Sequence, residues 1–483
     1  MSPNRSVSWG WKGEGGVREV VVLAFPLVLS TGSWAVQHFV DRMFLAWHSP
    51  EAVAAAMPAG ILNFSAMSLF IGAASYVSTF VAQYSGAGMS RRIGPVLWQG
   101  VYFSLVGALV MAGLIPVAGP FFTMVGHDPA IRANEIVYFQ YLCIGAFPVI
   151  ASSALSGFFT GLGRPWPVMW VNLCATAVNL MGDYALIFGR WGFPEMGIRG
   201  AAIASVLSGF ASLALYGVLL GHPSRAKGYG LRSGWRPDSE LFGRLLAYGM
   251  PSGVQFFLDM AGFTAFILIV GRLGMVSLAA TTIAFNINTL AFMPMIGIGI
   301  AVSVLVGRHI GRQDPETASR STYSGFFLTF VYMGVVAFLY VAVPGLFTAP
   351  FAAGSEAELF GEIERLTRVL LRFVALYSLF DTMNIVFASA IKGAGDTRFV
   401  MYMIVAVSAC VLVIPTWVVV SVLHWGIMAA WTSATAYVIV LGFVFFLRFR
   451  QGKWKGMRVI EEKPVIHPLP PAASECPDTK FEP

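Results

Sequence analysis

Residues 283–311 read IAFNINTLAFMPMIGIGIAVSVLVGRHIG, and no charged residue stands between Ile283 and Gly307. A run of about 20 apolar residues is long enough to cross the hydrocarbon core of a bilayer as an α-helix. The whole chain has the same character: 57% of its 483 residues are hydrophobic, 11% are charged, and the mean hydropathy is +0.72. Soluble domains carry about 25% charged residues, so the composition indicates an all-α polytopic membrane protein.

Eleven further apolar runs bring the predicted membrane helices to twelve. We place the twelve at residues 20–45, 53–84, 94–118, 134–160, 166–189, 198–220, 245–271, 277–307, 321–344, 367–391, 399–421 and 425–447. An even number of spans puts both termini on the same side of the membrane.

The distribution of basic residues predicts which side this is. Cytoplasmic loops of membrane proteins carry an excess of Lys and Arg. All but eight of the 31 Lys and Arg residues fall in the two tails and in the loops on the same side as the tails, whereas the 351–366 loop, predicted outside, is acidic. We therefore expect a multi-pass protein of a bacterial-type inner membrane with both termini cytoplasmic. The net charge of +7 is explained by this topology and indicates no nucleic-acid partner.

The stretch 283–311 also shows that the chain is duplicated. Shifted by 225 residues, its Asn288, Gly297, Ser303 and Gly311 coincide with the same residue types in the first half, and so does Pro251. The first-half counterparts are Asn63, Gly72, Ser78, Gly86 and Pro26. Each half has six spans, so the halves share one orientation, and we expect a pseudo-two-fold axis along the membrane normal.

The duplication predicts five parts of the chain. These are an N-terminal cytoplasmic tail (1–19), a first six-helix bundle (20–220), a basic cytoplasmic linker (221–244), a second six-helix bundle (245–448) and a disordered cytoplasmic tail (449–483). Two bundles with a seam between them suit alternating access to a central site. This architecture favours a secondary transporter over an enzyme.

Four aspartates lie inside predicted spans: Asp41, Asp183, Asp259 and Asp381. An Asp at the centre of a membrane helix costs about 2.5–3.5 kcal/mol on insertion scales, so such residues face the bundle interior or a wet cavity. Each has a polar residue four positions earlier, on the same helix face; these partners are Gln37, Asn179, Gln255 and Tyr377.

The depths of the aspartates suggest two sites. Asp41 and Asp183 lie in the outer portions of two spans that run in the same direction, so they could share a site in the first bundle. Asp259 and Asp381 lie nearer mid-membrane in the second bundle. A buried carboxylate can be neutralised by H⁺, by Na⁺ with further oxygen ligands, or by a cationic substrate. Competition among these cations at a site open to one side at a time is the physical basis of antiport.

Several stretches together resemble the multidrug and toxic compound extrusion (MATE) family over residues 15–450. They are the segment from Pro26 to Asp41, VAQYSGAG (81–88), GLGRP (161–165), NLMGDYALIFG (179–189), GMPSGVQFFLD (249–259), residues 283–311 and DTMNIVFASAIKGAGDTR (381–398). The resemblance implies an exporter of organic cations driven by inward movement of Na⁺ or H⁺, without a cofactor.

The resemblance also implies residue roles, mixing two branches of the family. Asp259 and Asp381 match the acidic positions of NorM-type members, where Na⁺ is the possible ligand, and Asn286 and Asn288 lie in the matching part of the eighth span. Pro26, Asp41, Asn179 and Asp183 match the site of DinF-like members. NorM-type patterns carry Glu where this chain has Asp259, which leaves the geometry of that site open. The choice between Na⁺ and H⁺ also stays open.

Pro26 and Pro251 lie inside spans, where a proline removes a helix hydrogen bond and can provide a hinge or a static bend. A flippase for lipid-linked saccharides should show cavity-facing Arg or Lys, and an integral-membrane enzyme should show a catalytic constellation at one membrane face. We find neither in the sequence. The expected partners are therefore small organic cations and the lipid bilayer, with the protein acting as a monomer.

Overall fold

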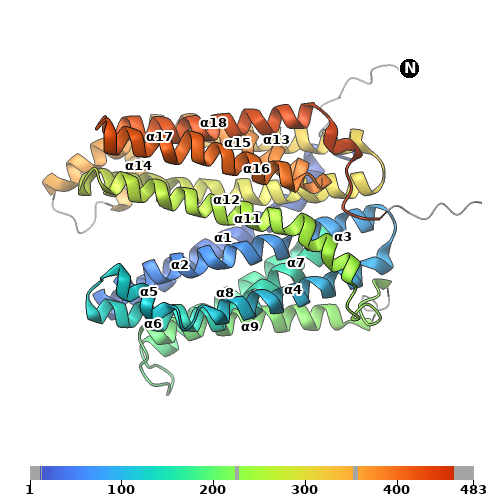
Figure 1. Ribbon diagram of the computed structural model, residues 1–483, viewed down its shortest axis with the longest axis horizontal. Helices are drawn as coiled ribbons and strands as arrows, with labels where there is room; N and C mark the ends of the chain where they lie inside the picture. Colours follow the sequence, from blue (N-terminus) through green and yellow to red (C-terminus); the bar gives the residue numbers. More distant parts are fainter. Residues whose placement is uncertain (1–10, 12, 224–227, 352–356, 462–483) are drawn as a thin grey trace, which may run out of the picture.

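The computed structural model describes residues 11, 13–223, 228–351 and 357–461, and the regular structure in these ranges is entirely helical. The long helices lie side by side in two bundles, with the described ends of the chain at the same end of the molecule (Figure 1). We call this end the terminus-side end. The prediction of an all-α protein with two six-helix bundles is confirmed.

The first bundle is built from the first half of the chain. Its elements are α1 (Val17–His48), α2 (Pro50–Ser75), α3 (Val77–Gly86), η1 (Ser90–Arg92), α4 (Ile93–Gly113), α5 (Ala118–Val125), α6 (Pro129–Ile144), α7 (Ala146–Gly161), α8 (Trp166–Ile187) and α9 (Ile198–Gly221). Two predicted spans are each formed by two helices, α2 with α3 and α6 with α7. The α6–α7 pair is bent by 44°.

The second bundle repeats this arrangement. Its elements are α11 (Ser239–Gly271), α12 (Met275–Gly311), α13 (Pro315–Ala342), α14 (Pro344–Thr348), η2 (Ala349–Phe351), α15 (Ala357–Ala394), α16 (Thr397–Val407), η3 (Ser408–Val413), α17 (Ile414–Trp417), η4 (Val418–Val422), α18 (Ile427–Arg450) and η5 (Lys453–Gly456). The segments α16 to η4 form one span, in which η3 and η4 are π-helical turns.

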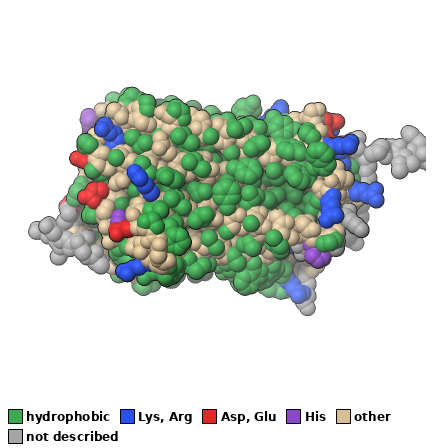
Figure 2. Space-filling model, turned by 90° about the horizontal axis from the view of Figure 1, so that it is seen from below, with side chains coloured by type: hydrophobic (Ala, Val, Ile, Leu, Met, Phe, Trp, Pro, Cys, Tyr) green, Lys and Arg blue, Asp and Glu red, His purple; other side chains and the backbone are tan. Residues whose placement is uncertain are grey.

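The outer surface fits a bilayer. Ten helical segments of the described chain are long and apolar enough to span a membrane, and the bent α6–α7 pair makes up to eleven. The one predicted span outside this count, 166–189, is α8, which has 22 residues and carries the polar Asn179 and Asp183. Figure 2 shows a broad hydrophobic surface across the middle of one face of the molecule, with most of the charged side chains toward its two ends.

Close glycine contacts reveal the pseudo-symmetry of the halves. A Cβ added to Gly86 would lie 2.0 Å from the carbonyl oxygen of Arg308, and a Cβ on Gly311 would lie 2.2 Å from the carbonyl oxygen of Gln83. The 225-residue shift converts the first pair into the second. Within the bundles, a Cβ on Gly161 would lie 2.5 Å from the Ser78 oxygen, and one on Gly393 would lie 2.4 Å from the Ser303 oxygen. Related residues therefore make related contacts, both between and within the bundles.

The first helix of each half packs on the opposite bundle at the terminus-side end. Val20 and Leu27 of α1 belong to the buried cluster of the second half, which we call the C-terminal core. Leu241 and Leu245 of α11 belong to the buried cluster of the first half, the N-terminal core. The two cores are therefore interlocked through the beginnings of α1 and α11.

Two predicted boundaries differ from the structure. The linker predicted at 221–244 is shorter, because α11 already begins at Ser239, where Asp238 caps the helix by accepting a hydrogen bond from the Leu241 amide at 3.0 Å. The tail predicted to be disordered from residue 449 is ordered as far as Glu461, because Trp454, Val459 and Ile460 are buried. The remainder of that predicted tail, 462–483, lies outside the described residues, as do most of the predicted N-terminal tail and residues 224–227 of the linker.

Candidate functional site

A buried acidic pair joins α1 and α8 in the first bundle. Asp41 lies on α1 and is 6% exposed, while Asn179 and Asp183 lie one turn apart on α8 and are fully buried. The carboxyl groups of Asp41 and Asp183 face one another closely enough to interact directly. The two helices pack against each other along their length, so residues 142 positions apart in sequence meet in one site.

Hydrogen-bonding capacity is left unused at this site. Among the described residues, no hydrogen-bond partner satisfies Asp41 Oδ1, both carboxylate oxygens of Asp183, or the Nδ2 and Oδ1 atoms of Asn179. Buried polar atoms are nearly always satisfied, and a group left unsatisfied costs about 1–3 kcal/mol. Five such atoms at one place, three of them carboxylate oxygens, form a site suited to a proton or a small cation.

A buried tyrosine and an exposed arginine lie near the Asp41–Asp183 pair. The buried side chain of Tyr138, on α6, interacts electrostatically with both Asp41 and Asp183. Arg42 follows Asp41 in the chain; its side chain is exposed and interacts electrostatically with Asp41, without an ion pair in the described structure. Gln37 is half-buried, one turn before Asp41.

The second bundle holds a looser acidic cluster. Asp381 on α15 is 8% exposed and accepts a hydrogen bond from the Asn384 amide at 2.9 Å. Asp259 on α11 is half-buried, lies beside Gln255, and interacts electrostatically with Asp381. The predicted association of Asp259 with Asp381 is therefore present, with the two carboxyl groups on different helices.

Only one of the two asparagines predicted on α12 joins this region. The Asn288 amide donates a hydrogen bond to the Tyr377 hydroxyl at 3.2 Å, and its carbonyl accepts one from the Ser378 hydroxyl at 3.4 Å. Tyr377 in turn interacts with Asp381. Asn286, by contrast, is exposed and makes no hydrogen bond within the described part of the chain.

Lys392 is a member of the second cluster that was not predicted. The predicted span ends at residue 391 and would leave Lys392 in a loop, but α15 continues to Ala394, and the Lys392 ammonium interacts with the Asp259 carboxylate. The two groups do not form a direct ion pair in the described structure. Lys392 thus supplies positive charge to the second cluster, whereas the Asp41–Asp183 pair has no buried basic partner among the described residues.

Three further members of these clusters were also missed. Asn384 lies three positions after Asp381, and this spacing on a helix face could have identified it. The buried Tyr437 of α18 interacts with both Asp259 and Asp381, and Tyr138 has the corresponding role in the first bundle. No sequence signal connects either tyrosine with its aspartates, because both contacts depend on how distant helices pack.

Side chains that favour a resident transition metal are not gathered here. In the described ranges no three His, Cys, Asp or Glu residues lie together as a metal-binding group. The oxygen-rich clusters instead fit H⁺ or a hard monovalent cation as a transported ion. Both predicted hinge prolines, Pro26 in α1 and Pro251 in α11, are buried inside continuous helices.

Comparisons with known proteins identify the family of this chain. The MatE family model matches residues 26–185 and 251–419, one match in each half. A probable multidrug resistance protein NorM of Bradyrhizobium diazoefficiens is 29% identical over 436 residues, covering 89% of this chain and 92% of that protein. A protein of the same description from Thermotoga maritima is 24% identical, covering 93% and 95%.

Solved structures share the fold. A MOP superfamily transporter from Pyrococcus furiosus superposes with a TM-score of 0.82 at 20% identity, covering 94% of this chain and 100% of that one. A MATE family transporter described as outward-facing gives a TM-score of 0.83 at 18% identity with the same coverage. The family model covers well over half of the chain, in two matches that coincide with the two bundles, and the protein therefore belongs to the MatE family of membrane transporters.

Proposed function

We propose that this protein exports organic cations in exchange for Na⁺ or H⁺, with Asp41 and Asp183 as the coupling site. As a member of its family it is a multidrug efflux transporter and not an enzyme. The observation that supports the coupling site is the buried Asp41–Asp183 pair, with three carboxylate oxygens unpartnered among the described residues.

The physical argument begins with repulsion. Two ionised carboxylates in contact repel each other strongly where water is excluded, so such a pair binds a proton or another cation. Asn179 adds one carbonyl ligand and one amide donor to the same site. If this site is exposed alternately to the two sides of the membrane, one cation enters from outside and leaves inside in each cycle.

We assign the substrate's positive charge to the second cluster. Asp259 and Asp381 provide two carboxylates, and Tyr377 and Tyr437 provide aromatic faces that attract cations. The same oxygens, with Asn288, could bind Na⁺ instead, so the choice of coupling ion is an outcome of the experiment below. Lys392 would balance the negative charge when no cation is bound.

The orientation and the assembly are part of the proposal. The positive-inside rule favours a cytoplasmic location of the terminus-side end in a bacterial plasma membrane. One chain contains both clusters and both bundles, so a monomer suffices for transport. A flippase for lipid-linked saccharides is not favoured, since the relatives are named for multidrug resistance.

The test uses purified protein in liposomes loaded with ethidium, a fluorescent organic cation, with a Na⁺ or a H⁺ gradient imposed separately. Asp41→Asn and Asp183→Asn should each abolish gradient-driven efflux, because each change removes one of the paired negative charges. Asp128→Asn is the matched control: Asp128 caps α6 on the exposed surface, and Asn caps helices equally well. It should transport like the wild type.

Two outcomes would contradict the proposal. Wild-type efflux by both pair variants would remove the coupling role of Asp41 and Asp183. Efflux that responds to neither gradient would remove antiport itself. A response to only one gradient identifies the coupling ion and supports the proposal.

A further inference from the structure

The segment that follows α18 crosses from one bundle to the other. We call residues 453–461 the strap. At its start, the indole of Trp454 stacks on Phe449 with ring centroids 4.8 Å apart and donates a hydrogen bond to the Phe449 carbonyl at 2.8 Å. Trp454 belongs to the C-terminal core, whereas Val459 and Ile460 belong to the N-terminal core. The four residues 455–458 therefore join the two cores at the terminus-side end.

A buried glutamine links the strap to both bundles. Gln83 of α3 is fully buried, and its amide nitrogen donates hydrogen bonds to the carbonyls of Gly393 at 3.0 Å and Ala394 at 3.3 Å. Its amide oxygen accepts a hydrogen bond from the Val459 amide at 3.0 Å. One side chain of the first bundle thus holds the end of α15 and the strap together.

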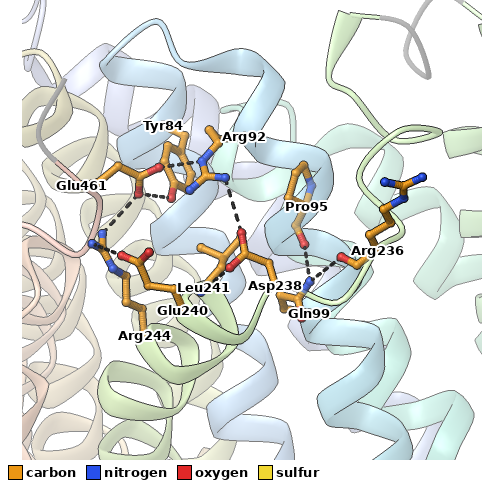
Figure 3. A network of polar contacts seen from close by, with 10 residues as sticks. All are labelled: Tyr84, Arg92, Pro95, Gln99, Arg236, Asp238, Glu240, Leu241, Arg244 and Glu461. Carbon is orange, nitrogen blue, oxygen red and sulfur yellow. Dashed lines mark hydrogen bonds and ion pairs between the residues drawn. The ribbon is translucent and has the colours of Figure 1, made fainter. Parts of the chain in front are cut away.

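The strap ends in a charged network, shown in Figure 3. Glu461 accepts hydrogen bonds from the Tyr84 hydroxyl at 2.6 Å, from Arg92 Nε at 2.6 Å and from Arg244 Nη1 at 3.2 Å. Arg92 also faces Asp238 at 3.5 Å, and Arg244 pairs with Glu240 at 2.8 Å. Burial raises the pKa of Glu461, but the hydrogen bonds from Tyr84 and Arg92 outweigh it, and the pKa lies below its usual value. Glu461 is therefore ionised at neutral pH.

The strap also forms a wall of a cavity. This open cavity has a volume of about 750 Å³ and is lined by the beginning of α11, the turn between α15 and α16, and strap residues Gly456, Met457 and Arg458. Inside this region the Tyr248 hydroxyl donates a hydrogen bond to the Arg458 carbonyl at 3.3 Å. The strap therefore borders a space that the beginning of α11 and the α15–α16 turn do not fill themselves.

We propose that the strap is the gate that holds the terminus-side end of the transporter closed, with Glu461 as its gate residue. The inference rests on alternating access in the proposed function, because that end must open for part of the cycle. The strap is covalently tied to α18, so separating the bundles pulls Val459 and Ile460 from the N-terminal core. It also breaks the contacts of Glu461 with Tyr84 and Arg92. The contacts of the strap thus favour the closed state of this end.

The test measures opening directly, without substrate or gradient. Spin labels are placed on the exposed positions 164 and 451, one on each bundle at this end, as Arg164→Cys and Gln451→Cys with the native cysteines replaced. Electron–electron distance distributions then give the ratio of open to closed molecules. Glu461→Gln removes the charge from three hydrogen bonds, and we expect it to raise this ratio about tenfold.

Glu316→Gln is the matched control. Glu316 of α13 pairs with Lys455 of the strap at 2.9 Å, but both belong to the second half, so this pair does not bridge the bundles. Its loss should leave the distances unchanged. Should Glu461→Gln fail to fold, Arg92→Gln removes the opposite partner and should shift the ratio in the same direction. In a double variant that folds, the two shifts of the ratio should not add in full, because both substitutions break the same Glu461–Arg92 contact.

Two results would overturn the gate: a Glu461→Gln distribution that superimposes on that of the wild type, or an equal shift with Glu316→Gln. The proposed function fails separately from the gate. A transporter whose labels move as expected but whose efflux responds to no gradient keeps the strap and loses the antiport mechanism.

Discussion

The two acidic clusters differ in whether a basic residue lies near their carboxylates. The Asp41–Asp183 pair has no buried basic partner among the described residues, whereas Lys392 faces Asp259 in the second bundle. A carboxylate already facing a lysine gains less from binding a further cation than one facing another carboxylate. The Asp41–Asp183 pair is thus suited to a cation that must be bound at all times. At Asp259, the Lys392 ammonium can take the place of a bound cation.

This difference makes Lys392 a test residue. In Lys392→Met the ammonium that competes at Asp259 is removed while the length of the side chain is kept. We expect the affinity for an organic cation to rise about tenfold, a change of roughly 1.4 kcal/mol. Ethidium binding to the purified protein, measured by fluorescence anisotropy, checks this.

Lys392→Arg serves as the control, because it keeps the positive charge and should leave the Kd near that of the wild type. Met at this position with unchanged or weaker binding, in a protein that remains folded, would show that Lys392 does not compete for the Asp259 site.

The acidic residues could be found from sequence, but their neighbourhoods only in part. Counting residues along two spans of the same direction placed Asp41 and Asp183 at similar depth, and the structure brings them together. Lys392 was missed because α15 extends three residues beyond the predicted end at 391. Tyr138 and Tyr437 contact aspartates on other helices, and side-chain packing between distant helices leaves no periodic trace in the sequence.

At the scale of elements, proline-containing helices lie at the seam between the bundles. Pro26 and Pro251 occupy equivalent positions of α1 and α11, the two helices whose beginnings pack on the opposite bundle. A proline inside a helix removes one backbone hydrogen bond and lowers the cost of bending there. The beginnings of these helices could therefore stay with one bundle while their remainders follow the other.

Restoring the missing bond should stiffen the helix. In Pro26→Ala the new amide can donate to the carbonyl of Val22, so we expect a higher unfolding temperature together with a several-fold slower gradient-driven efflux of ethidium. Pro58→Ala is the control, since Pro58 also lies inside a helix, α2, but has no proline counterpart in the repeat. An efflux rate in Pro26→Ala equal to that of Pro58→Ala would show that the bend is static.

Helix number and order followed from hydropathy, but the breaks within spans did not. The α6–α7 span bends by 44° at Gly145, and the helix is interrupted at Tyr76 between α2 and α3, where neither a glycine nor a proline stands at the break. The π-helical turns η3 and η4 flank α17, whose Pro415 has no amide hydrogen to donate to the helix. A hydropathy window averages over such interruptions and does not locate them.

At the scale of the whole molecule, the two bundles contact each other at glycines that are related by the pseudo-two-fold axis. Gly86 approaches the backbone of Arg308, and Gly311 approaches the backbone of Gln83, at the end that the strap covers. Neither contact has room for a side chain, and in each the obstacle is a backbone oxygen that cannot move alone. The closed arrangement of this end thus depends on close backbone approach on both sides of the axis.

A methyl group at either glycine should act as a wedge between the bundles. In Gly86→Ala the added carbon would lie 2.0 Å from the Arg308 oxygen, so closure requires the two helices to move apart. We expect the spin-label distances across the terminus-side end to lengthen and the open fraction to rise, and Gly311→Ala should give the same change because the axis relates the two sites. Gly113→Ala, in α4 of the first bundle, meets no atom within 4 Å and should leave the distances at their wild-type values.

Wild-type distances in both Gly86→Ala and Gly311→Ala would mean that the closed end tolerates the extra carbon and that the bundles are not held together at these glycines. A shift in only one variant would show that the duplicated contacts have diverged in function, although their geometry is still related by the repeat.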